Sequence, residues 1–163
     1  MINYSEKEIL SFLEAIPDPE IPVISIVELG VIRKIKMHTD SVEIDITPTY
    51  SGCPAMKQME DDIVSTLKAK GIEKINLKTV YDPAWTTDWI STEAREKLRK
   101  YGIAPPQGST HDKSVLMGKE KQVKCPRCGS LNTELVSQFG STACKALYKC
   151  KDCLEPFDYF KCI

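Results

Sequence analysis

Histidine is nearly absent from this sequence, with only His38 and His111 among 163 residues. One falls in a predicted turn and the other in a predicted linker, so a catalytic pair of cysteine and histidine is poorly supported. Apolar stretches long enough to cross a membrane are also lacking. The net charge of −1 gives no reason to expect bulk attraction to nucleic acid or to an anionic membrane. The chain therefore lacks the usual sequence marks of a cysteine protease, a membrane protein or a nucleic-acid-binding protein.

Cysteine, by contrast, is plentiful and unevenly placed. Six of the seven cysteines fall in the last quarter of the chain, namely Cys125, Cys128, Cys144, Cys150, Cys153 and Cys162, whereas Cys53 stands alone. Acidic residues at the N-terminus replace the basic and apolar regions of a signal peptide. We therefore expect a cytoplasmic, reducing location, where cysteines serve as metal ligands or working thiols rather than as disulfides.

The apolar pattern predicts an α+β fold in which helices cover one face of a small mixed sheet. We expect three segments: an α+β domain over residues 1–103, a proline-containing linker over 104–122 and a zinc ribbon over 123–163. A first helix is predicted to begin at a capping box near the N-terminus and to end at a proline-rich loop. The remaining predicted elements are strands over 31–37, 42–46 and 75–81, and helices over 54–70 and 92–101.

Two CxxC pairs in the tail predict a metal-binding module. Cys125 and Cys128 form the first pair, Cys150 and Cys153 form the second, and 21 residues separate the pairs. Each CxxC turn presents two sulfurs on one side, and two such turns complete a tetrahedral site. Four protein ligands leave no open position for a substrate, so we expect structural zinc that supplies folding energy to a module too short for its own core. An iron–sulfur centre is the alternative, because four cysteines serve both metals.

Two tail cysteines remain outside these pairs. Cys162 lies one residue from the end of the sequence and is interpreted as incidental. Three interpretations of Cys144 stay open: a packed small residue, a substitute metal ligand, or an exposed thiol near partner contacts. Lysine and arginine make the tail locally basic, but such charge is mostly solvated surface, so we predict no nucleic-acid partner.

Cys53 is predicted to lie at the start of the helix that Pro54 begins. Free backbone N–H groups and the helix dipole there stabilise negative charge, which lowers the pKa of a thiol and favours metal binding or nucleophilic attack. Gly52 permits close backbone approach and is expected to leave the thiol accessible. A buried, packed cysteine is the alternative. Asp18 and Glu20 belong to a proline-rigidified loop that leads into the same sheet, so we hypothesise that they join Cys53 in a mixed oxygen and sulfur site suited to transient iron.

Three segments resemble the SufT-like family of iron–sulfur assembly factors. They read Asp18-Pro19-Glu20-Ile21-Pro22, Val27-Glu28-Leu29-Gly30-Val31-Ile32 and Thr47-Pro48-Thr49-Tyr50-Ser51-Gly52-Cys53-Pro54. The resemblance covers residues 5–85 and implies a fold like the scaffold domain of iron–sulfur assembly proteins, with a role in iron–sulfur maturation. The family's characteristic cysteine matches Cys53, and its acidic loop matches Asp18 and Glu20.

A second resemblance covers nearly the whole chain. The segments 81–90, 101–106 and 139–147 are similar to the PaaD family, whose members are subunits of phenylacetyl-CoA epoxidase (phenylacetate-CoA oxygenase) complexes. This family implies an accessory subunit, not itself an enzyme, of a multicomponent monooxygenase in aerobic phenylacetate degradation. The implied partners are a di-iron oxygenase and an iron–sulfur, flavin-containing reductase. This chain shows no flavin, nicotinamide or di-iron carboxylate motif, so no residue is assigned a catalytic role.

Together these patterns predict a maturation factor. We hypothesise that Cys53, with Asp18 or Glu20, transiently holds iron or an iron–sulfur cluster and delivers it to the epoxidase complex. The alternative is a non-catalytic structural subunit that stabilises the oxygenase complex. The segment from Trp85 to Trp89 is hypothesised to be a docking surface, and the alternative is that both indoles cap the edge of the core.

Overall fold

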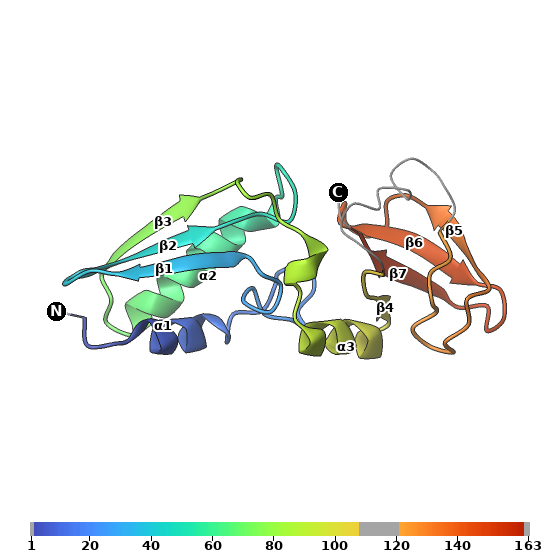
Figure 1. Cartoon of the computed structure of the whole chain (residues 1–163), viewed down its shortest axis with the longest axis horizontal. Coiled ribbons are helices and arrows are strands. Elements are labelled where there is room, and N and C mark those ends of the chain that lie inside the picture. Colours follow the sequence, from blue (N-terminus) through green and yellow to red (C-terminus); the bar gives the residue numbers. More distant parts are fainter. Residues whose placement is uncertain (1, 108–120, 162–163) are drawn as a thin grey trace. The chain divides into compact units, whose positions relative to one another are not determined.

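The computed structural model describes residues 2–107 and 121–161, and the chain divides into two compact units between Trp85 and Thr86. The first unit contains α1 (Glu6–Leu13), β1 (Ile32–Met37), β2 (Ser41–Ile46), α2 (Ala55–Ala69) and β3 (Lys74–Thr79), as labelled in Figure 1. The second contains the 3₁₀ turn η1 (Thr87–Trp89), α3 (Thr92–Tyr101), β4 (Ile103–Ala104), β5 (Thr133–Ser137), β6 (Lys145–Cys150) and β7 (Pro156–Phe160). Among the residues described, no helix is long and apolar enough to cross a membrane.

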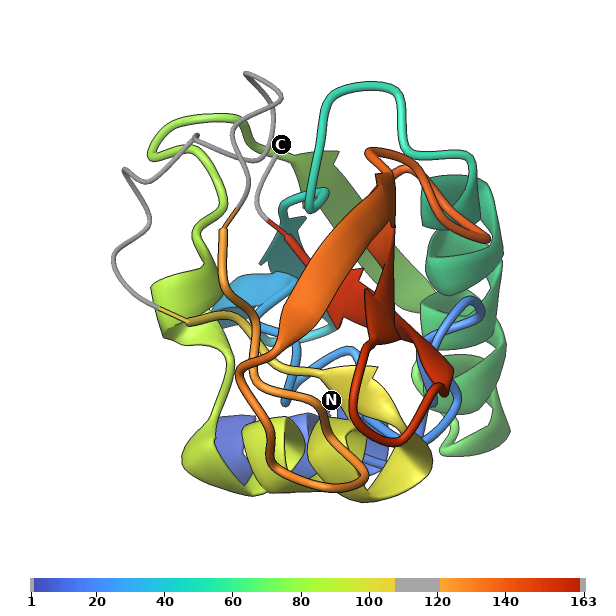
Figure 2. The ribbon, with the colours of Figure 1, turned by 90° about the vertical axis from the view of Figure 1, so that its right-hand side faces the viewer.

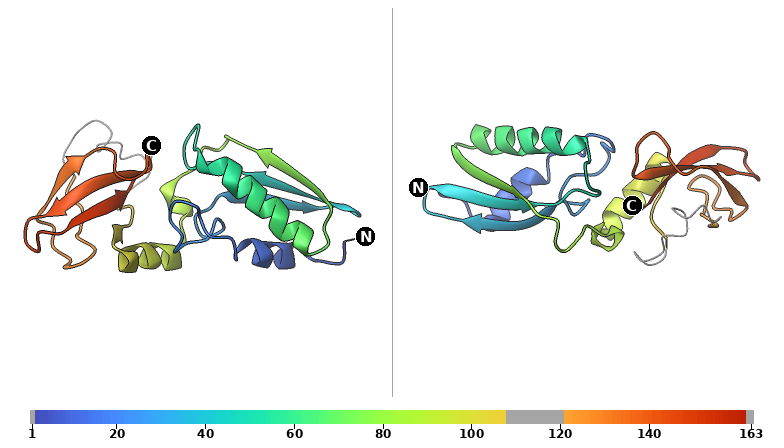
Figure 3. Two further views of the ribbon diagram at one scale, coloured as in Figure 1. Left: turned by 180° about the vertical axis from the view of Figure 1, so that it is seen from behind. Right: turned by 90° about the horizontal axis from the view of Figure 1, so that it is seen from above.

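The first unit is a three-stranded sheet with helices on one face. β1 pairs antiparallel with β2, and β2 pairs parallel with β3, so the sheet is mixed as predicted. Val42, Ile44 and Ile46 of the central strand are fully buried. The helices α1 and α2 pack against each other and against the same side of the sheet (Figure 3). The predicted α+β fold is thereby confirmed.

The loop between α1 and β1 contributes buried side chains to the core. Ile21, Ile24 and Leu29 within it are buried. The N–H of Asp18 donates to the carbonyl of Ile24 at 2.8 Å, which folds the proline-rich segment back on itself. This loop is therefore a fixed part of the core, and it holds Asp18 and Glu20 in place.

The second unit is built on a four-stranded sheet in the order β4-β7-β6-β5. β4 runs parallel to β7, whereas β7, β6 and β5 are antiparallel neighbours. In Figure 2 the strands β5, β6 and β7 of this sheet are turned toward the viewer and are coloured orange to red. The core of this sheet is small and consists of Ala104, Val123, Cys125, Ala146, Tyr148, Cys150, Phe157 and Tyr159. Two of the predicted metal ligands are thus part of the hydrophobic core.

The second unit begins earlier in the chain than the predicted ribbon. The sequence places α3 with the first domain and sets the boundary after Ile103, but the structure groups α3 and β4 with the ribbon. The reason is that Ile103 and Ala104 pair with β7, and that Arg95 of α3 donates to the carbonyls of Thr87 and Pro106. Most of the predicted linker lies outside the described residues.

Candidate functional site

Four cysteine sulfurs meet between two turns of the second unit. Cys125 and Cys128 lie in the turn before β5, whereas Cys150 ends β6 and Cys153 lies in the turn before β7. Their Sγ atoms all lie within 4.8 Å of one another, with 3.7 Å between Cys125 and Cys153 and 3.5 Å between Cys128 and Cys150. Sulfurs bound about 2.3 Å from a tetrahedral ion stand about 3.8 Å apart. The four predicted ligands are therefore brought together in a cluster that fits such an ion.

Backbone N–H groups donate to these sulfurs. The N–H groups of Cys153 and Asp152 favour the thiolate of Cys150 and lower its pKa to about 7. The N–H of Ser130 favours the thiolate of Cys128 in the same way, but the pKa of Cys128 is raised, because partial desolvation and hydrogen bonds with the neighbouring cysteine side chains favour its protonated form. A bound cation removes that opposition, since it neutralises the charge that four thiolates accumulate.

A side-chain network links the two cysteine turns. Ser130 Oγ donates to Asp152 Oδ2 at 2.5 Å, and Asn132 Nδ2 donates to Asp152 Oδ1 at 2.7 Å. These two hydrogen bonds lower the pKa of Asp152. Because the N–H groups of Ser130 and Asp152 themselves donate to ligand sulfurs, the network fixes the donors of both turns.

Each cysteine pair is followed by a residue with positive φ. Gly129 follows the first pair with φ +78°, and Leu154 follows the second with φ 65°. Glycine adopts this conformation freely, whereas a leucine Cβ is strained there. The Leu154 side chain is also 66% exposed, so it gains little packing in return. Both turns are thus followed by a residue in the left-handed backbone conformation, and this conformation is more strained at Leu154 than at Gly129.

Cys144 lies outside the metal cluster. It is buried, and its sulfur lies 3.1 Å from the Thr142 hydroxyl. The interpretation of Cys144 as an exposed thiol is therefore wrong, and its burial agrees with a packed small residue. Cys162 and His111 lie outside the described residues.

Cys53 lies in a tight turn directly before α2. Its N–H donates to the carbonyl of Tyr50 at 3.3 Å, and Gly52 within the turn has φ +78°. Pro54 is the N-cap of α2, so Cys53 stands one residue before the cap. The Cys53 sulfur accepts hydrogen bonds from the N–H of Ala55 and from the Tyr50 side chain. The helix start therefore does supply N–H donation to this thiol, as the sequence predicts.

The surroundings of Cys53 nevertheless differ from the predicted ones. The residue is only 8% exposed, so the glycine before it does not leave it accessible. Burial raises the pKa of Cys53, and the negative charges of Glu20 and Asp18 raise it further. These effects outweigh the two hydrogen bonds, because desolvation and like charge both favour the neutral thiol. The predicted lowering of the Cys53 pKa is therefore wrong.

The acidic loop and the thiol are close enough to interact. Both Asp18 and Glu20 act electrostatically on Cys53. Asp18 is buried, and its Oδ1 accepts hydrogen bonds from the N–H groups of Glu20 at 2.9 Å and Ile21 at 2.7 Å, so this oxygen shapes the loop. Within residues 2–107 and 121–161, the tail cluster is the one group of three or more histidine, cysteine or carboxylate donors placed to share a metal. Cys53, Asp18 and Glu20 are thus neighbours but not a preformed three-ligand site.

Two aromatic residues, Tyr50 and Trp85, have roles in the structure that differ from those predicted from the sequence. Tyr50 belongs to the Cys53 site, although the sequence patterns assign it no role; its position three residues before Cys53 in a glycine-containing turn is a usable signal. Trp85 is buried, and its Nε1 donates to the carbonyl of Leu29 at 3.0 Å. Trp85 is therefore a core residue rather than a docking residue, and Trp89 is half-buried.

Two family profiles match this chain. The family described as an iron–sulfur cluster assembly protein matches residues 6–76, which include Asp18, Glu20 and Cys53. The family described as the PaaD zinc beta ribbon domain matches residues 109–161, which include the four clustered cysteines. Each matched segment thus contains one of the two candidate sites.

Two curated proteins are similar in sequence. A protein of Escherichia coli (strain K12), provisionally named as a subunit of 1,2-phenylacetyl-CoA epoxidase, is 49% identical over 156 residues, which cover 96% of this chain and 92% of that protein. An Fe–S protein maturation auxiliary factor of Porphyromonas gingivalis (strain ATCC BAA-308 / W83) is 30% identical over 96 residues, which cover 58% of this chain and 90% of that protein.

Two solved structures share the fold of part of the chain. One is the crystal structure of a domain of unknown function, DUF59, from Bacillus anthracis. It superposes on this chain with a TM-score of 0.54 and 29% sequence identity, and the match covers 57% of this chain and 90% of the Bacillus chain. The other is a conserved hypothetical protein from Thermotoga maritima. Its TM-score with this chain is 0.51 at 26% sequence identity, and the match covers 58% of this chain and 94% of the Thermotoga chain. Somewhat more than half of this chain thus has the fold of a complete DUF59 domain.

Proposed function

Since this chain belongs to the PaaD family of 1,2-phenylacetyl-CoA epoxidase subunits, we propose that it serves such an epoxidase as an accessory subunit that delivers iron or an iron–sulfur cluster. The observation that carries the proposal is the Cys53 loop. The carboxylates of Asp18 and Glu20, from the loop before β1, are near enough to act electrostatically on the Cys53 thiol, and all three residues belong to the segment that matches iron–sulfur assembly proteins. The proposed recipient is the oxygenase or the iron–sulfur reductase of the complex, and the proposed location is the cytoplasm.

The charges around Cys53 suit a transient cargo. Without a cation, Glu20 and Asp18 oppose loss of the thiol proton. An incoming ferrous ion reverses this balance, because it neutralises the same charges and favours the thiolate. Iron binding therefore releases the Cys53 proton to solvent and forms a thiolate–iron bond, with a carboxylate oxygen as a further ligand. When iron leaves, the thiolate takes up a proton again, and the raised pKa favours this release.

For the tail cluster we propose a structural zinc ion. Cys125, Cys128, Cys150 and Cys153 supply four sulfurs at the spacing of a tetrahedral site. Bound zinc supplies folding energy to the small core that Cys125 and Cys150 share with the ribbon strands. We also propose that the chain is not itself a catalyst. Protein sulfurs fill every position of a tetrahedral ion, and a buried, protonated thiol such as Cys53 is a weak nucleophile.

A second candidate function is a structural subunit that stabilises the oxygenase without carrying metal. The burial of Cys53 favours this structural role, because a thiol that only packs against its neighbours can be buried without any loss of function. The two candidates differ in stoichiometry. A structural subunit co-purifies with the oxygenase in a stable, equimolar complex, whereas a delivery factor associates substoichiometrically or only during maturation.

Anaerobic purification followed by metal analysis and visible absorption tests the cargo site. The intact chain is compared with Cys53→Ser, and Cys144→Ser serves as the control because Cys144 is a buried cysteine outside both sites. After incubation with ferrous iron, we expect iron in the intact chain and in the control but not in Cys53→Ser, with zinc unchanged in all three. Equal iron in all three proteins would refute a cargo site at Cys53.

A further inference from the structure

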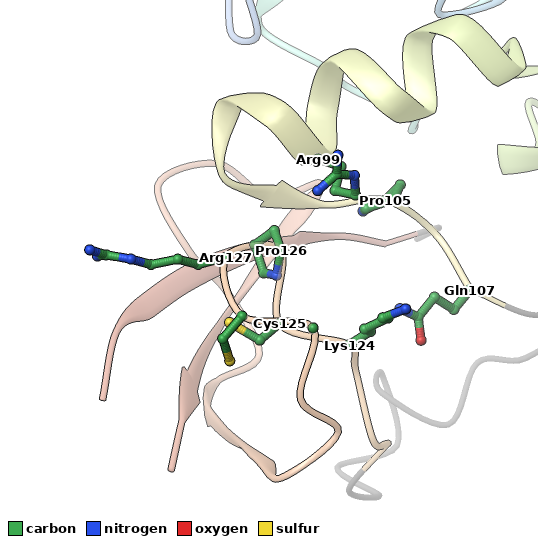
Figure 4. A pocket seen from close by; sticks show the side chains of 9 residues that line it. Arg99, Pro105, Gln107, Lys124, Cys125, Pro126 and Arg127 are labelled. Carbon is green, nitrogen blue, oxygen red and sulfur yellow. The ribbon is translucent and has the colours of Figure 1, made fainter. Parts of the chain in front are cut away.

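A positively charged groove lies beside the first cysteine turn of the second unit. Its volume is about 380 Å³, and it is lined by Arg99, Pro105, Gln107 and the segment 124–129. Three cations line it: Arg99 near the end of α3, Lys124 before the first cysteine, and Arg127 between the two cysteines of the turn (Figure 4). Among the described residues that line the groove there is no carboxylate. The groove is therefore complementary to negative charge.

The positive surface continues past the groove. A neighbouring hollow of about 280 Å³ shares Arg99, Cys125, Pro126 and Arg127 with it and adds Lys100, together with one carboxylate, Glu155, which pairs with Arg127. Figure 4 shows that Arg127 extends outward from the turn, whereas Lys124 runs toward Gln107. The cations thus form a strip along the turn rather than one closed pocket.

The ion pairs of these cations are weak enough to exchange. Arg99 pairs with Glu96 at 2.7 Å, and Arg127 pairs with Glu155, but the arginine side chains are 49% and 67% exposed. Exposed pairs of this kind contribute little free energy, because water screens them. Lys124 has no ion-pair partner within the part of the chain that the structure describes, and its stem lies against Gly129. A partner's carboxylates can therefore replace the internal ones at small cost.

We propose that this groove docks an acidic segment of a partner protein, and, on the basis of the proposed function, that this partner is another subunit of the epoxidase complex. The cations sit on long, exposed side chains, which steer association over a distance and set the orientation of docking. Pro105 and Pro126 add apolar contact area to the same groove, as a protein segment requires and a free phosphate does not.

The two units then have separate tasks. The first unit carries the cargo cysteine, and the second unit carries the surface that recognises the recipient. A metal held by the four cysteines would have a second role, because it would fix the turn from which Lys124 and Arg127 project. Loss of docking and loss of cargo should accordingly follow from different substitutions.

Binding of the full-length chain to the purified remaining epoxidase subunits tests the proposal. The double variant Arg99→Glu/Lys124→Glu is compared with the wild type by surface plasmon resonance at low and at physiological salt. Lys149→Glu is the matched control, because Lys149 is an exposed ribbon lysine that lines neither the groove nor its neighbour. We expect the double variant to bind about tenfold more weakly, mainly through slower association, and we expect the control to bind like the wild type. Added salt should weaken wild-type binding and leave the variant nearly unaffected.

Several outcomes would overturn the proposal. Unchanged subunit binding by the double variant is one, and an equal loss in the control is another. A third is that the wild type binds a single-stranded DNA probe in a salt-dependent manner and that the double variant loses this binding but still binds the subunits. That result would assign the groove to nucleic acid instead. Zinc content is measured in every protein, and Arg99→Gln/Lys124→Gln replaces the double variant if charge reversal reduces it. Failure of the cargo proposal is distinguishable, because Cys53→Ser should lose iron but keep subunit binding.

Discussion

The hydroxyl of Ser130 and the carboxylate of Asp152 join the two halves of the metal cluster by a hydrogen bond of 2.5 Å. The backbone N–H groups of the same two residues donate to the sulfurs of Cys128 and Cys150. Side chain and main chain therefore act together at each position. The side chains hold the two turns in register, and the N–H groups stabilise the negative charge that the turns present to a metal.

Asp152→Ala should loosen the metal. The substitution removes the acceptor of both Ser130 and Asn132, so the N–H donors to the sulfurs lose their fixed geometry. We expect a chelator to extract zinc about tenfold faster than from the wild type, measured by the absorbance of a colorimetric zinc chelator. Glu134→Gln is the control, because Glu134 makes only an exposed ion pair with Lys151. Equal extraction rates for Asp152→Ala and the wild type would show that the network is dispensable.

Leu154→Gly should stabilise the ribbon. Leu154 has φ 65° and an exposed side chain, so glycine relieves strain without removing packing. We expect the free energy of unfolding of the metal-loaded chain to rise by about 0.5 kcal/mol, since strain relief of about 1 kcal/mol is partly offset by the greater freedom of glycine in the unfolded chain. Leu131→Gly is the matched control at an exposed leucine without positive φ, and it should destabilise. Thermal unfolding distinguishes the two, and a destabilised Leu154→Gly would contradict the strain argument.

Two substitutions should move the pKa of Cys53 in opposite directions. Glu20→Gln removes a negative charge that raises this pKa, so it should lower it. Tyr50→Phe removes a hydrogen bond that favours the thiolate, so it should raise the pKa further. The measurement is the rate of Cys53 alkylation by iodoacetamide as a function of pH, resolved by peptide mass spectrometry. The wild-type midpoint should lie above that of an ordinary cysteine, and shifts of both variants in the same direction would contradict this description of the site.

Arg95→Lys should destabilise the second unit. The Arg95 guanidinium donates to the carbonyls of Thr87 at 2.6 Å and Pro106 at 2.8 Å, and so ties the segments on both sides of α3 to one side chain. Lysine cannot present two such donors at once. We expect a loss of about 1–3 kcal/mol in the free energy of unfolding, measured with urea. Arg99→Lys, at an exposed ion pair on the same helix, should change it by less than about 0.5 kcal/mol, and equal effects of the two variants would refute the bridging role of Arg95.

Local sequence patterns predict the secondary structure well where the determinants are themselves local. The helix predicted over 92–101 matches α3 because Ser91 caps its start and Gly102, with φ +96°, ends it. The boundary between the units is missed because β4 has only two residues, Ile103 and Ala104, which pair with β7 far along the chain. Two residues carry no periodic pattern, so sequence alone cannot place them.

The two candidate sites differ in how far sequence reaches them. The four cysteines of the cluster follow from their spacing, since a CxxC turn places its sulfurs by itself. The position of Cys53 before a helix also follows from the sequence, but its burial and raised pKa do not. These depend on packing and on charges from the loop around Asp18 and Glu20, which lies more than thirty residues earlier in the chain.

Delivery of iron through Cys53 should be visible in the iron content of the recipient. The epoxidase is purified from strains that lack the native protein and carry either the wild-type chain, Cys53→Ser or the Cys144→Ser control. We predict that the epoxidase from the Cys53→Ser strain contains markedly less iron and has correspondingly lower activity than the other two. Equal iron content and equal activity in all three strains would contradict delivery through Cys53.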